Sequence, residues 1–512
     1  MKAWRVSNWF VKITLDSSAE EDFRVNVAKW ISTAVASALL ASTIGTTTIA
    51  HAEENTHQIE NESIYDVLVD RFFNKSVEND YNINAKDPKA FHGGDFAGID
   101  TKIEHIKSMG FTMISLGSVF SSTTYDGSAV VDYSKVERHF GTSKELKSLI
   151  KNLHKNDIKS MVDFPINNVS KDHAWALEEN HNDWYTVANN HRINWNTNNP
   201  DVQQALIDAA TNFIAKYKVD GIRLTQLENV DTAFINKMIK ALKQQDKELY
   251  VISNEPSDAD FDIDYNPQTI GTYQSIFKNV DEDSSKVEEP YKPFVNGETN
   301  KPTALMIDDL NSARFTHAAA EENMFPPTRI KVALGALMTM PGVPIVTYGT
   351  EIAQNGVKPT ETHAAMDFRT KEDIMDYLED LQSVRNKSQT LRTGKFKLLE
   401  NKNGLMVYER YSNDEKWIVM VNNTDKTKRY QLDSSVIGQN KELRGLFESD
   451  IVHQSDNGKY NLVLERELVE LYQVTDKKGI NIPYMIALGL VYVLFIAFIV
   501  AILRRGRNRK NA

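Results

Sequence analysis

The sequence predicts an α/β domain built on a parallel sheet, followed by a small all-β domain and one C-terminal membrane-spanning helix. From Ser63 onward, apolar runs of strand length alternate with helical patterns, as they do in βα units. After about Gly394, short apolar runs are instead separated by turns rich in Asn, Asp, Gly and Ser. Ile482 to Leu503 is an apolar run without a charged residue.

The strands and helices are expected in the following order. Strands of the parallel sheet are predicted at 64–69, 112–116, 160–164, 221–224, 250–253, 304–307 and 343–348. A further strand is expected between Asp260 and Glu289, where the apolar pattern does not locate it. Helices with apolar residues at helical spacing are predicted at 143–154, 202–217, 233–244 and 329–340. The strands of the β domain are expected at 397–399, 405–410, 417–422, 430–432 and 462–474.

Composition excludes one class of partner and constrains the fold. The chain has 512 residues, of which 41% are hydrophobic and 25% charged, the balance of a globular protein. A formal net charge of −11 and the lack of a basic, aromatic-rich patch predict no nucleic-acid partner. With no cysteine, an exported body must be stable without disulfides.

Both ends of the chain indicate export. About 22 apolar residues from Ile482 span roughly 33 Å as a helix, enough to cross a bilayer. The basic segment 504–510 that follows places the tail in the cytoplasm and the body outside. Trp30 to Ala50 resembles a signal segment, and Ala50-His51-Ala52 fits a cleavage site. Acidic residues at 20–22 leave an uncleaved signal anchor open as an alternative.

Several motifs along the body occur in a recognisable order. They are Ile64-Tyr65 with Val69-Asp70-Arg71-Phe72-Phe73, Gly93-Gly94-Asp95, Asp132-Tyr133 with His139-Phe140-Gly141-Thr142, Asp163 to Asn168, Val219 to Thr225, and Pro341 to Pro344 with Tyr348 to Glu351. Together they resemble the α-amylase family, glycoside hydrolase family 13, over about 64–475. The resemblance implies a (β/α)8 barrel with its site at the carboxyl ends of the strands, and a C-terminal β-sandwich.

The predicted domain organisation follows from the resemblance and the two ends. It comprises a signal peptide or anchor at 1–52, a barrel at 53–390 with a short excursion at about 165–199, a β domain at 391–475, a linker at 476–481, a membrane helix at 482–503 and a basic tail at 504–512.

The catalytic positions implied by the resemblance are mostly substituted. A retaining glycosidase needs a nucleophilic carboxylate and an acid/base carboxyl about 5–5.5 Å apart, and this family adds a third acid. The resemblance places the nucleophile at Thr225, after Arg223, the acid/base at Glu255 and the third acid at Asn311. Of these three positions Glu255 alone keeps a carboxyl group. We expect it to ionise, to pair with Arg223 and to fail as a proton donor.

The sugar-contact positions are substituted as well. Asn168 and Leu310 stand where the family has histidines, and Ser128 with Ala129 replaces a tyrosine and an aspartate. The Thr225 hydroxyl would need an adjacent base to become nucleophilic, and none of these positions keeps a histidine.

The leading hypothesis is therefore a catalytically degenerate protein on the outer face of the cell membrane. It would bind an α-glucan or oligosaccharide, or a membrane-protein partner. The alternative is an active or residual α-glycosidase on α-1,4/1,6-glucans that uses Glu255 with Asp309.

A calcium site is a further expectation from the resemblance. Neopullulanase-like members bind calcium through a loop after the first strand, and Asn74, Asn79, Asp80, Gly93 and Asp95 match that pattern. Oxygen ligands of this kind suit Ca²⁺, which would be structural. The alternative is that these residues simply form a turn.

Overall fold

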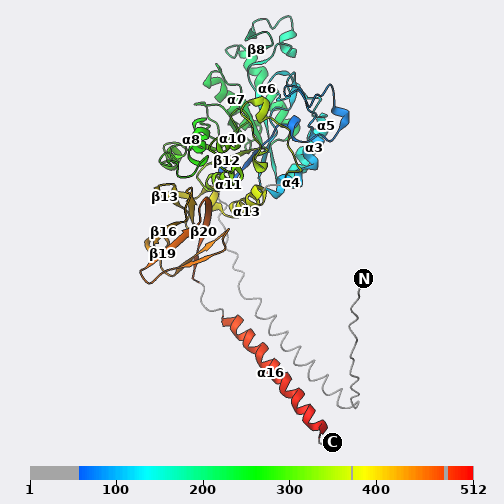
Figure 1. Cartoon of the computed structure of the whole chain (residues 1–512). Helices are drawn as coiled ribbons and strands as arrows, with labels where there is room; N and C mark the ends of the chain where they lie inside the picture. Colours follow the sequence, from blue (N-terminus) through cyan, green and yellow to red (C-terminus); the bar gives the residue numbers. More distant parts are fainter. Residues whose placement is uncertain (1–56, 371–372, 478–481, 511–512) are drawn as a thin grey trace. The chain divides into compact units, whose positions relative to one another are not determined.

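The computed structural model describes residues 57–370, 373–477 and 482–510. The predicted signal segment 1–52 lies outside the described residues, as does 478–481 of the predicted linker. The body is a parallel barrel with helices around it, continued by a C-terminal β domain (Figure 1).

Seven parallel strands form the main sheet, in the order β10-β9-β5-β2-β1-β12-β11. Each strand is short and buried, as expected when helices cover the outer face of the sheet. Their bounds are β1 Ile64–Asp66, β2 Met113–Ser115, β5 Lys159–Pro165, β9 Gly221–Thr225, β10 Tyr250–Ser253, β11 Ala304–Leu305 and β12 Val343–Thr347.

A short extended segment closes the sheet into a barrel. The amide of Asp262 donates to the carbonyl of Val251 in β10 at 2.9 Å, and the amide of Ala304 in β11 donates to the carbonyl of Asp264 at 3.0 Å. Asp264 also forms a parallel bridge with Thr303. This segment is the strand that the sequence pattern did not locate, because it contributes a single bridge rather than an apolar run.

Local sequence signals set where the covering helices begin. Thr142 and Glu145 form a capping box at the start of α5, and Asn199 followed by Pro200 caps α6. Asp231 caps α7 through its side chain. The longer helices are α3 Phe96–Thr101, α4 Ile103–Ser108, α5 Ser143–Lys155, α6 Pro200–Tyr217, α7 Thr232–Gln245, α8 Gln268–Phe277, α10 Phe315–Glu321, α11 Pro326–Leu337 and α13 Asp373–Lys387.

The two-residue period of the strands builds the barrel interior in layers. Ile64, Met113 and Met161 belong to one buried apolar cluster inside the barrel. Two residues further along the same faces stand Asp66 and Asp163. The apolar layer therefore supports a polar layer nearer the carboxyl ends of the strands.

The C-terminal β domain packs directly on the barrel helices. Arg410 is fully buried and donates from Nη1 to the carbonyl of Thr339 at 2.7 Å. The predicted single strand 462–474 is wrong: it is two strands, β19 and β20, because Glu467 between them takes a left-handed φ of 56°. The strands are β13 Lys395–Lys402, β14 Leu405–Tyr411, β15 Lys416–Asn422, β16 Lys428–Asp433, β17 Lys441–Gly445, β18 Ile451–His453, β19 Lys459–Leu464 and β20 Leu468–Asp476.

Two other segments complete the described chain. The excursion at about 165–199 forms a small sheet of β6 (Val169–Ser170), β8 (Arg192–Trp195) and β7 (Tyr185–Val187). The C-terminal helix α16 spans Ile482–Lys510, longer than the expected 482–503, and its part Met485–Arg504 is long and apolar enough to cross a membrane.

Candidate functional site

A cavity of about 390 Å³ opens at the carboxyl ends of the barrel strands. Its size is within the range of small-molecule sites. Seven of the eight residues that the sequence assigns to catalytic or sugar-contact positions line it, and the fold thus brings these seven together; Ala129 is buried and is not part of the lining. The seven residues are Ser128, Asn168, Arg223, Thr225, Glu255, Leu310 and Asn311.

Arg223 lies at the floor of this cavity between two carboxylates. Its guanidinium donates to Asp163 at 2.7 and 2.9 Å and to Asp66 at 3.0 and 3.1 Å. The expected pairing of Arg223 with Glu255 is therefore wrong, because Asp66 and Asp163 occupy both edges of the fork. Burial lowers the pKa of Arg223, but the two aspartates outweigh it and raise that pKa above its usual value.

The two aspartates share one positive charge. Asp163 lies opposite Arg223 in the β5–β9 register, and Asp66 reaches the same guanidinium from β1. Burial, and then repulsion from Asp66, raise the pKa of Asp163 above its ordinary value, although Arg223 opposes both. Two carboxyl groups on the floor of the cavity therefore share a single guanidinium. Asp66 was not among the predicted residues, although an acid at the end of the first strand was a usable signal.

The Glu255 carboxylate faces the chain that leaves β9. It accepts hydrogen bonds from the backbone amides of Gln226 and of Leu227, the latter at 2.9 Å. Gln226 has a left-handed φ of 57°, which turns the chain so that these two amides converge on one carboxylate. Both oxygens of Glu255 are thereby engaged as acceptors.

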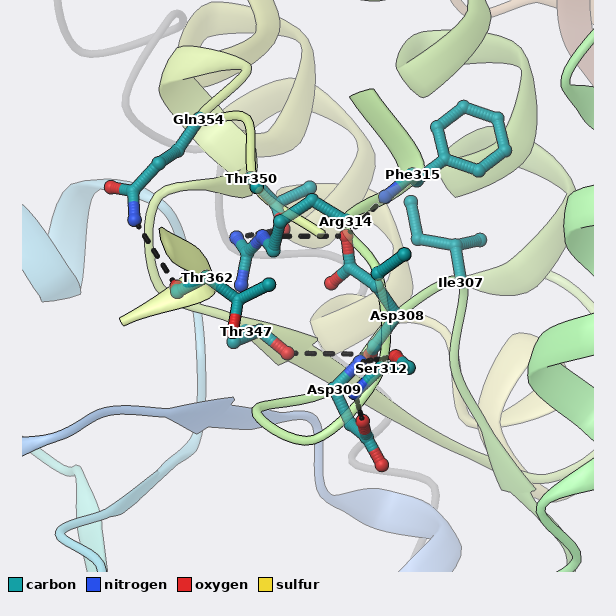
Figure 2. A network of polar contacts seen from close by, with 12 residues as sticks. Ile307, Asp308, Asp309, Ser312, Arg314, Phe315, Thr347, Thr350, Gln354 and Thr362 are labelled. Carbon is teal, nitrogen blue, oxygen red and sulfur yellow. Dashed lines mark hydrogen bonds and ion pairs between the residues drawn. The ribbon is translucent and has the colours of Figure 1, made fainter. Parts of the chain in front are cut away.

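Asp309 is also engaged by neighbouring groups, as Figure 2 shows. Its Oδ1 accepts from the amides of Asn311 at 2.9 Å and Ser312 at 2.7 Å, and its Oδ2 accepts from the Tyr265 hydroxyl at 3.1 Å. The preceding Asp308 is buried and accepts from the Phe315 amide at 2.8 Å. Burial raises the pKa of Asp308.

The substituted rim positions are joined to one another. Arg192 donates to the Ser128 hydroxyl at 3.0 Å and to the Asn168 carbonyl at 2.7 Å. The side-chain amide of Gln226 donates to the Ser128 carbonyl at 2.9 Å. Ser128 in turn donates to Asp126 at 2.9 Å. Hydrogen bonds within the chain therefore connect the residues of the rim.

A histidine that the motifs did not indicate lines the cavity. His363 Nε2 is 2.6 Å from the Leu310 carbonyl, which can only accept, so Nε2 carries the proton. Its Nδ1 then accepts from the Tyr125 hydroxyl at 2.9 Å. Burial lowers the pKa of His363. Sequence reasoning missed it because it follows the last motif, but both of its nitrogens are occupied and neither serves Thr225.

The aromatic residues of the excursion pack together. Trp195 is buried, and its ring lies 5.4 Å from that of Trp175 and 4.9 Å from that of His173. Trp175 lies 5.3 Å from Tyr133. The rings therefore pack against one another and do not form an open platform for sugar stacking.

The five predicted calcium ligands lie in one loop cluster. Asn74 donates to Asp80 at 2.8 Å, and a Cβ at Gly93 would come within 2.6 Å of both side chains. Asp95 accepts from the amides of residues 75, 76 and 98. The side-chain amide nitrogen of Asn79 is buried without a partner among the described residues. Both carboxylates accept hydrogen bonds from within the chain, and no three His, Cys, Asp or Glu gather there or elsewhere in the described ranges.

Comparison with known proteins identifies the family. A crystal structure of an Anoxybacillus α-amylase superposes with a TM-score of 0.79 and 33% identity, over 83% of this chain and 100% of that one. The α-amylase of Geobacillus thermoleovorans, complexed with acarbose, matches with a TM-score of 0.76 and 31% identity, over 82% and 100% of the two chains. The chain belongs to the α-amylase family. The (β/α)8 barrel and the C-terminal all-β domain expected from the sequence are thereby confirmed.

Family models and curated relatives match particular parts of the chain. The model of the α-amylase catalytic domain matches residues 66–195, and that of the α-amylase C-terminal domain matches 394–472. The first match ends before β9. The intracellular maltogenic amylase of Bacillus subtilis is 24% identical, over 74% of this chain and 71% of its own. The β/α-amylase of Paenibacillus polymyxa is 26% identical over 80% of this chain, which spans only 38% of that protein.

Proposed function

We propose that this α-amylase-family protein binds a saccharide in the barrel cavity without hydrolysing it. The observation that carries the proposal is the position of Glu255. The group at the acid/base position has both oxygens hydrogen-bonded to the amides of Gln226 and Leu227. An acid/base must instead present one oxygen to the glycosidic bond and exchange a proton there.

The other two catalytic positions support the same proposal. Thr225, at the end of β9, has no histidine or carboxylate hydrogen-bonded to its hydroxyl in the described part of the chain. Asn311 supplies a neutral amide where the family has an acid. Asp309 is held by Asn311, Ser312 and Tyr265. Because electrostatic stabilisation is usually the largest catalytic contribution, these substitutions should lower the rate by several orders of magnitude.

The direct test is a search for hydrolysis products. The full-length protein in detergent would be incubated at high concentration with starch, maltooligosaccharides, pullulan and cyclodextrins, beside a Glu255→Gln variant. Mass spectrometry would follow the products. No cleavage by either protein supports the proposal, whereas cleavage that is lost in the variant contradicts it.

The competing function is a residual or altered α-glycosidase. Two observations favour it: the similar proteins are named amylases, and Asp66 and Asp163 keep two carboxylates in the cavity. However, both aspartates are fully engaged with Arg223. If cleavage is found, replacement of Asp309 as well as Glu255 would identify the second acid.

We also propose that α16 anchors the body to the outer face of the cell membrane. The support is its apolar part Met485–Arg504, with a mean hydropathy of 3.1, and the basic residues that follow. Protease added to intact cells should digest the body and spare the tail. Recovery of the full-length chain in the soluble fraction would contradict the anchor. A pull-down of the anchored chain would test for a membrane-protein partner.

A structural calcium ion is proposed in the cluster of Asn74, Asn79, Asp80, Gly93 and Asp95. The support is the convergence of these residues and the space that only a glycine leaves at Gly93. Bound there, the ion would join the chain after β1 to the segment that leads into α3.

A further inference from the structure

A short segment joins the β domain to the helix α16. Strand β20 ends at Asp476, and the amide of Lys477 still donates to the Asn440 carbonyl at 2.9 Å. The helix begins at Ile482, and its apolar part begins at Met485. The helical residues before Met485 rise about 4.5 Å, which is within the depth of the headgroup layer. Because residues 478–481 alone lie between Lys477 and the helix, the two are at most about 18 Å apart.

This segment leaves the body near the amino ends of the barrel strands, as a chain of hydrogen bonds shows. Arg385 near the end of α13 donates to the carbonyl of Glu60, which precedes β1, at 2.8 Å. Ser388, which follows α13, donates to the Glu415 carboxylate. The same carboxylate accepts from the Gln473 side chain at 3.3 Å. Gln473 lies close to the end of β20, so the chain leaves the body on the side where β1 begins.

The cavity opens at the opposite ends of the same strands. Its lining includes Asp66 at the end of β1, Thr225 at the end of β9 and Glu255 just after β10. A compact body of about 420 residues, as in 57–477, has a diameter of roughly 55 Å. If the cavity faced the bilayer, Lys477 would lie most of that diameter from the membrane, which exceeds the reach of the linker.

Strand register identifies the surface that lies beside the linker. Strand β17 begins at Lys441, opposite Asp476 at the end of β20, and β15 begins next to the Trp417–Gln473 pair. The segments that precede these two strands, 412–415 and 438–440, therefore lie at the linker end of the β domain. Their exposed residues are polar or glycine, a composition that suits hydrated headgroups rather than the hydrocarbon core.

We propose that this end of the β domain faces the phospholipid headgroups of the outer leaflet and that the cavity is directed away from the bilayer. The saccharide then reaches the cavity from the extracytoplasmic medium, and a sugar on a lipid of the same membrane does not. This deepens the proposed function and rests on two of its claims, the membrane anchor and saccharide binding.

Single cysteines can test the orientation, because the natural chain has none. Asn413→Cys and Gln439→Cys are exposed in the two headgroup-facing segments. The matched control is Asn190→Cys, exposed in the turn between β7 and β8, in the excursion that supplies the cavity residue Asn168. Each full-length variant would carry a fluorophore and be placed in nanodiscs whose lipids bear a nitroxide on the headgroup. We expect quenching at Asn413 and Gln439 and none at Asn190.

A longer linker tests whether the short one sets this orientation. A flexible Gly/Ser insertion of about 20 residues after Lys477 adds roughly 25 Å of root-mean-square reach. It should reduce the quenching at Asn413 and Gln439. Equal quenching at all three labelled positions in the parent linker, or stronger quenching at Asn190, overturns the orientation. Quenching that the insertion leaves unchanged overturns the role of the linker.

The source of the saccharide is tested with soluble maltotriose. Its dissociation constant would be measured for the full-length protein in nanodiscs that hold one copy, with and without lipids that carry a maltosyl headgroup. We expect no change, whereas soluble maltose, the control competitor, should raise the apparent dissociation constant. A rise caused by the maltosyl lipid overturns the proposal.

Failure of the proposed function gives different results. A chain that does not enter nanodiscs contradicts the anchor. Absence of maltotriose binding contradicts saccharide binding and leaves the quenching pattern as the measure of orientation.

Discussion

The backbone amide of Leu227 donates a hydrogen bond of 2.9 Å to the carboxylate of Glu255, and the amide of Gln226 donates to its other oxygen. The group that a glycosidase would use to protonate a leaving group here joins β10 to the chain that follows β9. Glu255 is thus the residue type expected at the acid/base position, but its contacts are those of a structural residue.

Replacement of Glu255 by Gln should therefore affect stability rather than turnover. The variant places an amide NH2 against a backbone N–H, so one hydrogen bond to a charged acceptor is lost. We expect a loss of about 1–3 kcal/mol in the free energy of unfolding, measured by urea titration. Glu228→Gln, an exposed acid three residues beyond Thr225, is the control and should change nothing. An unchanged stability for Glu255→Gln would show that these hydrogen bonds do not form in solution.

Restoring one acid should not restore catalysis. Thr225→Asp returns a carboxylate to the nucleophile position, but Glu255 remains bound to two amides and Asn311 remains neutral. We expect no α-glucan cleavage above that of the parent protein in the mass-spectrometric assay. Cleavage by this single variant that disappears with Glu255→Gln would mean that Glu255 leaves its amide partners when substrate binds.

Loss of Arg223 should be more severe than loss of either aspartate. Arg223→Met leaves the buried Asp66 and the partly buried Asp163 without a counter-charge, which should cost about 3–5 kcal/mol of unfolding free energy. Combining it with Asp66→Asn and Asp163→Asn should recover most of that loss. Chemical denaturation of the single and triple variants measures both. Equal stabilities of the single and triple variants would show that water solvates the carboxylates that have lost Arg223.

His173 should make the protein sensitive to acid. It is fully buried in the excursion, and burial lowers its pKa to about 4. Because the folded pKa lies below the unfolded value near 6.5, the unfolded chain binds the proton first as pH falls. This group therefore leaves stability intact above about pH 6.5 and removes about 3 kcal/mol between there and about pH 4.

His173→Asn should weaken that dependence. Nδ1 of His173 accepts from the Trp175 amide at 3.1 Å, and the Asn side-chain oxygen can take that role. The difference in unfolding free energy between the two proteins should shift toward the variant as the pH is lowered. His191→Asn, an exposed site in the same excursion, is the control. Parallel pH profiles for all three proteins would contradict the prediction.

Calcium should raise the melting temperature if the proposed site is occupied. Binding to the folded state alone stabilises it by an amount that grows with the ratio of free calcium to its dissociation constant. EDTA should remove the effect, and so should Asp80→Asn. Glu78→Gln, exposed in the same loop, should keep it. A melting temperature that does not respond to calcium in the parent protein would show that Asn74 and Asp80 serve the turn alone.

Much of the fold was predictable because it depends on patterns that a sequence shows directly. The helices α5, α6 and α7 begin at capping residues beside amphipathic segments, and strand β10 has the bounds predicted for it. The barrel segment at Asp262–Asp264 was not predictable, because it is held by a single bridge and by neighbours rather than by its own apolar pattern.

Part of the candidate site was predictable from the sequence and part was not. Motif spacing placed Arg223, Thr225 and Glu255 in one cavity, because the first two lie in the carboxyl-terminal half of β9 and Glu255 follows β10. The partners of those residues depend on side-chain directions that spacing does not set. Asp66 was therefore missed as a partner of Arg223, and His363 was missed because it comes from a segment after the last barrel strand without a motif of its own.

The contacts of Arg223 with Asp66 and Asp163 cross the interior of the barrel and connect β1, β5 and β9. The shape of the cavity consequently depends on residues other than those at the catalytic positions. Thr225 or Asn311 could be substituted during evolution without loss of the cavity's shape. Catalytic activity and ligand binding can then evolve separately in one barrel, because the contacts that shape the cavity do not involve the nucleophile, acid/base or third-acid positions.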